Sequence, residues 1–155
     1  MAHWSRSCLM LRASADFGFP DFTGSTILLV DDHRDSLDFL GEILRFCGAT
    51  VLAAWSTAHA RRHLRIFAPR LIVCDFQMPR ETGVEFMRWV RTQADERATI
   101  PAIAVTGYAR DFLRQRDVAF AFDAYFEKPV DVPRVLAMAE VLLLKPRRRG
   151  ELKRA

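Results

Sequence analysis

Residues 71–75 read LIVCD, an apolar run that ends abruptly at a carboxylate. Residues 26–32 read TILLVDD and repeat this arrangement, so that a second apolar run ends at Asp31 and Asp32. Short runs without polar interruption are typical of strands that are covered on both faces, as in a parallel sheet flanked by helices. These two segments therefore predict buried strands whose carboxyl ends carry acidic groups.

Outward from these segments, apolar runs alternate with longer amphipathic stretches. This alternation is typical of an α/β fold in which helices cover both faces of a parallel sheet. Five short strands are predicted, at 26–30, 50–54, 71–74, 102–105 and 124–126. The polar residues at or just beyond their carboxyl ends are Asp31, Asp32, Asp75, Thr106 and Lys128. The sequence thus predicts a doubly wound five-stranded parallel sheet.

Five helices are predicted, at 36–46, 57–67, 84–93, 110–119 and 133–143. In the first, Leu37, Leu40 and Leu44 recur at helical spacing, and Gly48 follows as a stop signal. Ser56 precedes the second helix and is of the type that caps helix N-termini. These signals indicate helices long enough to cover the sheet.

The composition favours one domain. The 155-residue chain is half apolar, which suits a single core, and we expect an unstructured extension at 1–24, a domain at 25–144 and a basic tail at 145–155. The tail holds six Lys or Arg and one Glu, so the net charge of +4 arises there. No apolar run approaches the roughly 20 residues of a membrane span. Three cysteines without metal-site spacing also favour a cytoplasmic protein.

The acids at the strand ends predict a metal site. If the first and third strands are neighbours, Asp31, Asp32 and Asp75 converge, and three such close carboxylates repel one another. A hard divalent cation removes this repulsion. We expect no histidine in this cluster. Mg²⁺ therefore fits its acidic ligands better than Zn²⁺ does, and Mn²⁺ is an alternative. The other interpretation is that these are separate loop acids that form turns or cap helices.

Four segments together resemble the receiver domains of response regulators, over residues 25–144. Their sequences are LVDD at 29–32, DFQMP at 75–79 with Gly83, VTG at 105–107 and KP at 128–129. They resemble, in order, the acid pair after the first strand, the phosphoacceptor segment, the switch hydroxyl site and the lysine–proline pair of that family. The resemblance implies a flavodoxin-like sheet with strand order 2-1-3-4-5.

The resemblance also implies roles for individual residues. Asp75 would be the nucleophile that takes a phosphoryl group from a phosphohistidine. The cation would be held by Asp31, Asp32, Asp75 and the backbone carbonyl of Gln77. Because phosphoryl transfer depends mainly on neutralising charge, the Lys128 ammonium would assist by facing the phosphoryl oxygens.

A switch is implied as well. Thr106 would donate its hydroxyl to a phosphoryl oxygen, and Tyr125, three residues before Lys128, would swing inward to fill the space that Thr106 leaves. In related domains the bond between Lys128 and Pro129 is usually cis, and we expect a cis bond here.

The implied partners are a sensor histidine kinase or a histidine phosphotransfer protein, and a downstream protein that binds the fourth helix, fifth strand and fifth helix. Neither membrane insertion nor nucleic-acid binding is expected, and the domain would act alone, catalysing only its own phosphorylation and dephosphorylation. Two alternatives stay open. One is an aspartate-nucleophile phosphatase, although residues 75–77 lack the second acid of its usual D-x-D motif. The other is a phosphorylation-independent interaction module with a nucleic-acid-binding basic tail.

Overall fold

The computed structural model describes residues 18–107 and 121–146 of the chain. Its five strands are β1 (Thr26–Val30), β2 (Thr50–Ala54), β3 (Leu71–Asp75), β4 (Ala102–Thr106) and β5 (Ala124–Glu127). They form one sheet in the order β2-β1-β3-β4-β5, and all four neighbouring pairs are parallel. The predicted α/β fold and its strand order are therefore confirmed.

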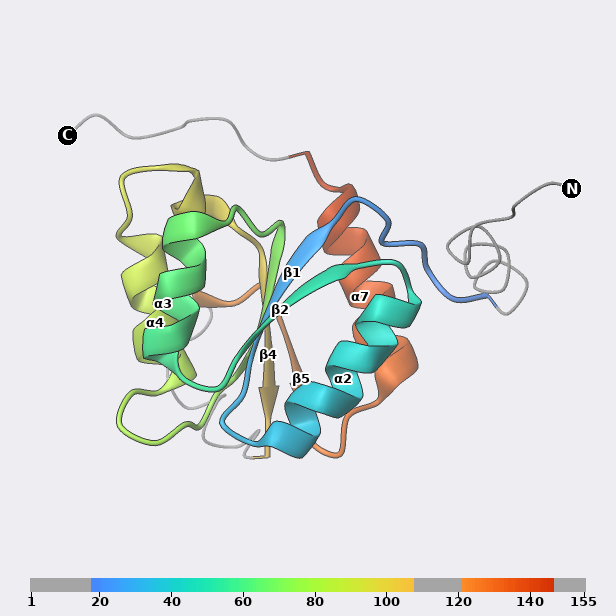
Figure 1. The fold of residues 1–155 in the computed structure, drawn as a ribbon, viewed down its shortest axis with the longest axis horizontal. Helices are drawn as coiled ribbons and strands as arrows, with labels where there is room; N and C mark the ends of the chain where they lie inside the picture. Colours follow the sequence, from blue (N-terminus) through green and yellow to red (C-terminus); the bar gives the residue numbers. More distant parts are fainter. Residues whose placement is uncertain (1–17, 108–120, 147–155) are drawn as a thin grey trace, which may run out of the picture.

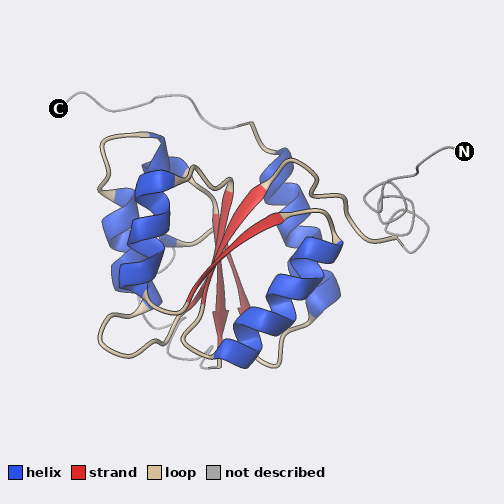
Figure 2. Cartoon of the chain, viewed as in Figure 1, coloured by secondary structure: helices blue, strands red, loops and turns tan. Residues whose placement is uncertain are grey.

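Four α-helices and one short 3₁₀-helix lie in the described residues, and Figure 2 shows the helices in blue. They are α2 (Arg34–Phe46), α3 (Thr57–Ile66), α4 (Gly83–Arg91), η1 (Glu96–Thr99) and α7 (Val132–Leu144). The fourth predicted helix, at 110–119, lies outside the described residues, as do most of the predicted N-terminal extension and basic tail. Among the helices that are described, none could reach across a lipid bilayer as an apolar span.

The helices cover the sheet in two layers, with α2 and α7 on one face and α3 and α4 on the other (Figure 1). Side chains of β1 alternate between these layers, so that Leu28 and Val30 join the core under α3 and α4, whereas Ile27 and Leu29 join the core under α2 and α7. Burial of each such side chain contributes about 1.5–3 kcal/mol. Two-sided burial explains why the strand sequences are apolar without alternation.

The helix ends follow local signals in the sequence. The Ser56 hydroxyl accepts a hydrogen bond from the His59 backbone N–H at 3.2 Å and caps α3. Thr82 and Glu85 form a capping box at the start of α4, which begins directly after the loop from β3. Gly48 has a φ of +89°, which suits a glycine just past the end of α2. These local signals fix the residues at which α3 and α4 begin and at which α2 ends.

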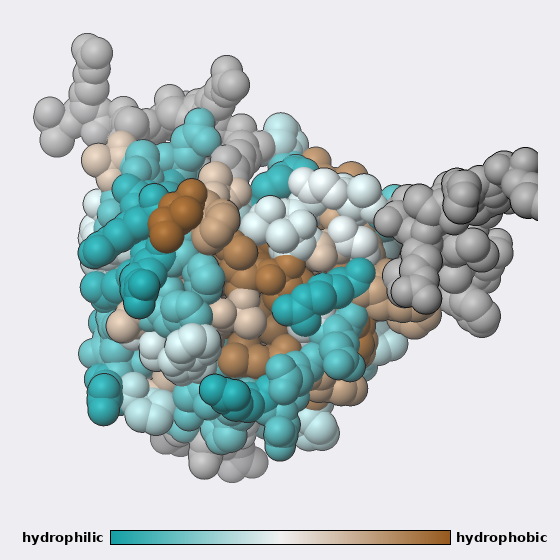
Figure 3. Space-filling view, in the orientation of Figure 1, coloured by the Kyte–Doolittle hydropathy of each residue, from teal (hydrophilic) through white to brown (hydrophobic). Residues whose placement is uncertain are grey.

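The edge strand β2 runs across the face shown in Figure 3. Hydrophobic residues reach the surface in the middle of that face, and hydrophilic residues surround them. The three central residues of β2, Val51, Leu52 and Ala53, are only half-buried, whereas every residue of β3 is buried. The strand that ends at Asp75 is therefore enclosed along its whole length, as is its neighbour β4.

Candidate functional site

Polar side chains from four strands meet at one edge of the sheet. Asp31 and Asp32 follow β1, Asp75 is the last residue of β3, Thr106 is the last of β4, and Lys128 follows β5. Since β1 pairs with β3, β3 with β4 and β4 with β5, all in parallel, these carboxyl ends lie side by side. In open α/β sheets this edge is where ligands bind.

Lys128 joins two of the acids. Its Nζ atom lies 2.8 Å from Asp31 Oδ2 and 2.8 Å from Asp75 Oδ2, and it donates a hydrogen bond to each. The Asp31 and Asp75 side chains are 8% and 5% exposed, so this one ammonium forms ion pairs with two nearly buried carboxylates. The bond between Lys128 and Pro129 is cis, which confirms the prediction.

The second oxygen of each buried carboxylate is held by the backbone. Asp31 Oδ1 accepts a hydrogen bond from the His33 N–H at 2.8 Å, and Asp75 Oδ1 accepts one from the Gln77 N–H at 3.1 Å. Such turns, in which an aspartate binds the N–H two residues on, fix the direction of the side chain. Both carboxylates are therefore oriented before any ligand arrives.

Burial and charge shift the pKa values in this cluster. Burial raises the pKa of Asp75 above its ordinary value, and the neighbouring Asp31 charge adds to this, while the hydrogen bond from Lys128 opposes it without cancelling it. Burial lowers the pKa of Lys128, but its hydrogen bonds to Asp31 and Asp75 outweigh that effect and leave the pKa raised. The ammonium is thus held in its charged form.

Replacing Lys128 with methionine should lower the free energy of unfolding. The change leaves Asp31 and Asp75 facing each other without a cation, at a cost of about 1–3 kcal/mol, which is less than for a fully buried pair because the lysine is 26% exposed. Because the folded pKa of Lys128 exceeds its ordinary value of 10.5, this stabilisation is fully present below pH 10.5 and is lost as pH rises through the folded pKa.

Urea unfolding in EDTA, at neutral and at strongly alkaline pH, tests this prediction. The exposed Lys145 supplies the matched control, because Lys145→Met should leave stability nearly unchanged. Equal stability of the Lys128→Met and wild-type chains at neutral pH would contradict the proposed contribution of the ammonium.

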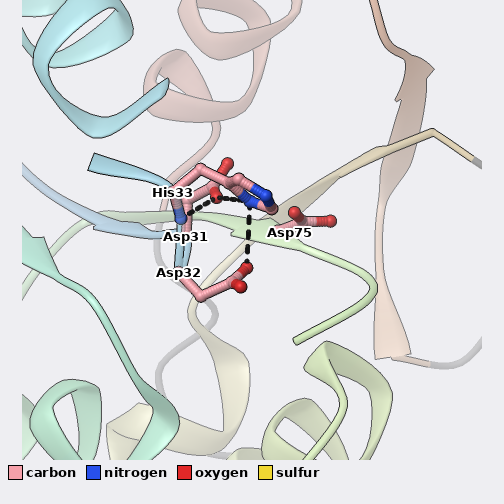
Figure 4. Close-up of side chains that lie close together, drawn as sticks. All are labelled: Asp31, Asp32, His33 and Asp75. Carbon is pink, nitrogen blue, oxygen red and sulfur yellow. Dashed lines mark hydrogen bonds and ion pairs between the residues drawn. The ribbon is translucent and has the colours of Figure 1, made fainter. Parts of the chain in front are cut away.

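The remaining acid, Asp32, has a histidine beside it. His33 Nδ1 lies 3.2 Å from Asp32 Oδ1 and 3.3 Å from Asp31 Oδ1. Figure 4 shows the imidazole between these two carboxylates, with Asp75 close by. One ligand atom from each of Asp31, Asp32, His33 and Asp75 lies within 4.8 Å of all the others. The expectation of a cluster without histidine is therefore wrong. The sequence did carry a signal for this histidine, because His33 directly follows the acid pair Asp31 and Asp32.

The donor set fits a divalent cation. Asp32 Oδ1 is buried and has no hydrogen-bond partner among the described residues, although His33 Nδ1 is near. A buried carboxylate oxygen that accepts no hydrogen bond is costly, and a cation would satisfy it. The three carboxylates also repel one another, and the Lys128 ammonium donates hydrogen bonds to two of them, Asp31 and Asp75. A cation beside Asp32 would complete the neutralisation of this cluster.

The other predicted site residues lie around this cluster. The Thr106 side chain is fully buried at the end of β4. Tyr125 lies on β5 opposite Ala104 of β4, and it is 42% exposed. The Gln77 side chain is exposed, and its backbone N–H contacts Asp75. The Asp75 carboxylate therefore contacts the Gln77 backbone, and the strand that Asp75 ends is paired with β4, which ends at Thr106.

The loop that follows Asp75 is held closely by contacts that the sequence did not predict. Gly83 approaches the backbone so closely that a Cβ atom there would lie 2.1 Å from the Asp75 carbonyl oxygen. Arg61 of α3 forms an ion pair with Glu81 in this loop, and its guanidinium lies 4.4 Å from the ring centroid of Trp89. These contacts tie the loop to both α3 and α4.

Comparisons with known proteins agree with this geometry. The family model described as "Response regulator receiver domain" matches residues 27–140. The chain is 40% identical over 105 residues to an uncharacterised 14.6 kDa protein from the sodA1 3′ region of Leptolyngbya boryana, an alignment covering 68% of this chain and 79% of that protein. It is 28% identical over 111 residues to the polar-differentiation response regulator DivK of Brucella anthropi, covering 72% and 89%.

A solved structure is similar as well. The signal receiver domain of a signal transduction histidine kinase from Syntrophus aciditrophicus matches with a TM-score of 0.70 and 26% identity, covering 85% of this chain and 99% of that one. The family model covers well over half of the chain, in the region that holds the five strands and the acidic cluster. The chain therefore belongs to the response regulator receiver domain family.

Proposed function

We propose that residues 25–144 form the phosphoacceptor domain of a two-component phosphorelay, in which Asp75 takes a phosphoryl group from a phosphohistidine. The donor would be a sensor histidine kinase or a histidine phosphotransfer protein. The observation that carries this proposal is the Asp75 carboxylate, nearly buried at the end of β3 and 2.8 Å from the Lys128 ammonium. A carboxylate in such surroundings has a fixed direction and a ready cation, which suits in-line attack on phosphorus.

The reaction breaks the N–P bond of the phosphohistidine and forms an O–P bond on Asp75, and the imidazole leaves. Little other covalent chemistry is needed, so that the chain's task is to orient the nucleophile and to neutralise charge. The Gln77 N–H holds one Asp75 oxygen at 3.1 Å and thereby orients the carboxylate. Lys128 would move from the carboxylate to the arriving phosphoryl oxygens, and Thr106 would donate its hydroxyl to another of them.

Asp31, Asp32, Asp75 and the backbone carbonyl of Gln77 would hold Mg²⁺ or Mn²⁺. When bound, such an ion would neutralise part of the charge on the phosphoryl oxygens. The buried Asp32 oxygen that lacks a hydrogen-bond partner among the described residues supports this assignment.

Phosphorylation would alter the surface around β5 and α7. Drawing Thr106 toward the phosphoryl group would open space beside β5, and the 42% exposed Tyr125 could then turn inward. The surface so remodelled would bind the downstream protein. The predicted fourth helix, which completes this face in the proposal, lies outside the described residues.

Addition of beryllofluoride with Mg²⁺, which mimics a phosphorylated aspartate, should change amide hydrogen exchange in β5 and at the start of α7. We expect slower exchange at β5, because the engaged Thr106 and the inward Tyr125 would tighten the packing there. Hydrogen exchange read by mass spectrometry on the full chain checks this. Beryllofluoride without Mg²⁺ is the control and should have little effect. Unchanged exchange at β5 and α7 with both reagents present would reject switching on this face.

A further inference from the structure

We infer that His33 is a nitrogen ligand of the divalent ion at the Asp31, Asp32 and Asp75 cluster, and that it shifts the preference of this site from Mg²⁺ toward a transition-metal ion such as Mn²⁺. This inference rests on the proposed function, because it concerns the same ion. It concerns a residue that the proposed ligand set of three carboxylates and one backbone carbonyl leaves out.

The distances fit one coordination sphere. His33 Nδ1 lies 3.2 Å from Asp32 Oδ1 and 3.3 Å from Asp31 Oδ1. Two ligand atoms that each lie about 2.1–2.2 Å from an ion, at right angles, are roughly 3.0 Å apart, and opposite ligands are roughly 4.3 Å apart. The donor atoms of the four residues lie within 4.8 Å of one another, which is close to the width of such a sphere. Small side-chain adjustments would therefore complete it.

The local backbone directs the imidazole toward the acids. His33 is the N-cap residue of α2, a position where the side chain usually accepts hydrogen bonds from the first turn. Its side chain forms no such cap, and its backbone N–H instead donates to Asp31 Oδ1 at 2.8 Å. The ring then lies between Asp31 and Asp32, as Figure 4 shows. The side chain is 69% exposed, so that an ion can enter from solvent on this side.

An imidazole changes which ions the site favours. Mg²⁺ takes oxygen ligands almost exclusively and keeps several waters, whereas first-row transition ions accept nitrogen and oxygen together. A site of carboxylates alone gives Mg²⁺ its best ligands. A site with one added imidazole binds Mn²⁺ more tightly and leaves Mg²⁺ binding nearly unchanged, since Mg²⁺ gains little from the nitrogen.

Replacing His33 with alanine should weaken Mn²⁺ binding by about 10-fold or more, while Mg²⁺ binding should change less than about 2-fold. Isothermal titration calorimetry of the full chain with each salt measures both constants. Electron spin-echo spectroscopy of bound Mn²⁺ adds a direct readout, because a coordinated imidazole gives a nitrogen coupling that should vanish in the His33→Ala chain.

The matched control is the double variant His59→Ala with His63→Ala. These histidines lie on α3 with ring centroids 4.4 Å apart and offer another source of metal-binding nitrogen. The control should keep both the Mn²⁺ affinity and the nitrogen coupling. Equal Mn²⁺ affinities for the wild-type and His33→Ala chains, or a coupling that survives His33→Ala, would overturn the inference on His33 alone. Absence of binding for both Mn²⁺ and Mg²⁺ in the wild-type chain would overturn the proposed metal site too.

Discussion

Replacing Asp75 with asparagine is expected to abolish phosphorylation by acetyl phosphate, from near-stoichiometric labelling to none. The amide cannot form an acyl phosphate, and no other described carboxylate occupies the end of β3, which is buried along its whole length. The variant should still fold, because asparagine has nearly the same shape and Lys128 keeps its 2.8 Å contact to Asp31. Removing a carboxylate whose pKa burial has raised also removes a desolvated charge.

Intact-mass spectrometry in the presence of Mg²⁺ measures this labelling. The control Asp38→Asn changes an exposed aspartate on α2 and should be labelled like the wild-type chain. Sensitivity of the label to hydroxylamine would identify an acyl phosphate. Stoichiometric labelling of the Asp75→Asn chain would falsify the assignment of the acceptor and would direct attention to Asp31 or Asp32.

Replacing Gly83 with alanine is expected to cost about 1–3 kcal/mol of stability, or more, and to impair labelling as well. The added Cβ would meet the Asp75 carbonyl oxygen at 2.1 Å, and both the Asp75 carbonyl carbon and Cys74 Sγ at 3.1 Å. The closest of these atoms belongs to the backbone, which cannot rotate away as a side chain does. Either the start of α4 or the backbone at Asp75 must therefore shift.

Gly107→Ala is the control for this substitution, since a Cβ at Gly107 would meet no atom of the described residues within 4 Å. Its free energy of unfolding should change by less than about 1 kcal/mol. Thermal unfolding and acetyl phosphate labelling of both variants separate the two expected effects. A Gly83→Ala chain with wild-type stability and labelling would show that the close approach at Asp75 does not constrain the site.

The strands were predictable because their buried, uninterrupted apolar runs leave few alternatives. β1 and β2 have the predicted bounds, and the other three strands each extend one residue further, to Asp75, Thr106 and Glu127. Backbone pairing needs no apolar side chain, so the ladder continues into polar residues that a hydrophobic pattern excludes. The helix α2 begins at Arg34, two residues earlier than predicted. The sequence carries no sign of this start, because the N-cap residue is His33 rather than one of the usual capping residues.

The site was predictable only in its chemical outline. The sequence places carboxylates after two strands and a lysine after a third, and the parallel pairing then brings them together. The direction of the His33 ring depends on the turn that Asp31 forms, which no spacing rule reveals. The contact of Arg61 with Glu81 joins α3 to the loop after β3, and neither residue carries a sequence signal for it. Such contacts follow from tertiary packing.

The contribution of several strands to one sheet edge has a thermodynamic consequence. The carboxylates and the ammonium at this edge are spread from Asp31 to Lys128, so that no fragment lacking either end could assemble them. A ligand that binds there would recognise the native chain alone, and at a hundredfold excess over its dissociation constant it would add about 2.7 kcal/mol to the free energy of unfolding. Occupancy and global folding are therefore linked equilibria, and the melting temperature becomes a direct readout of site saturation.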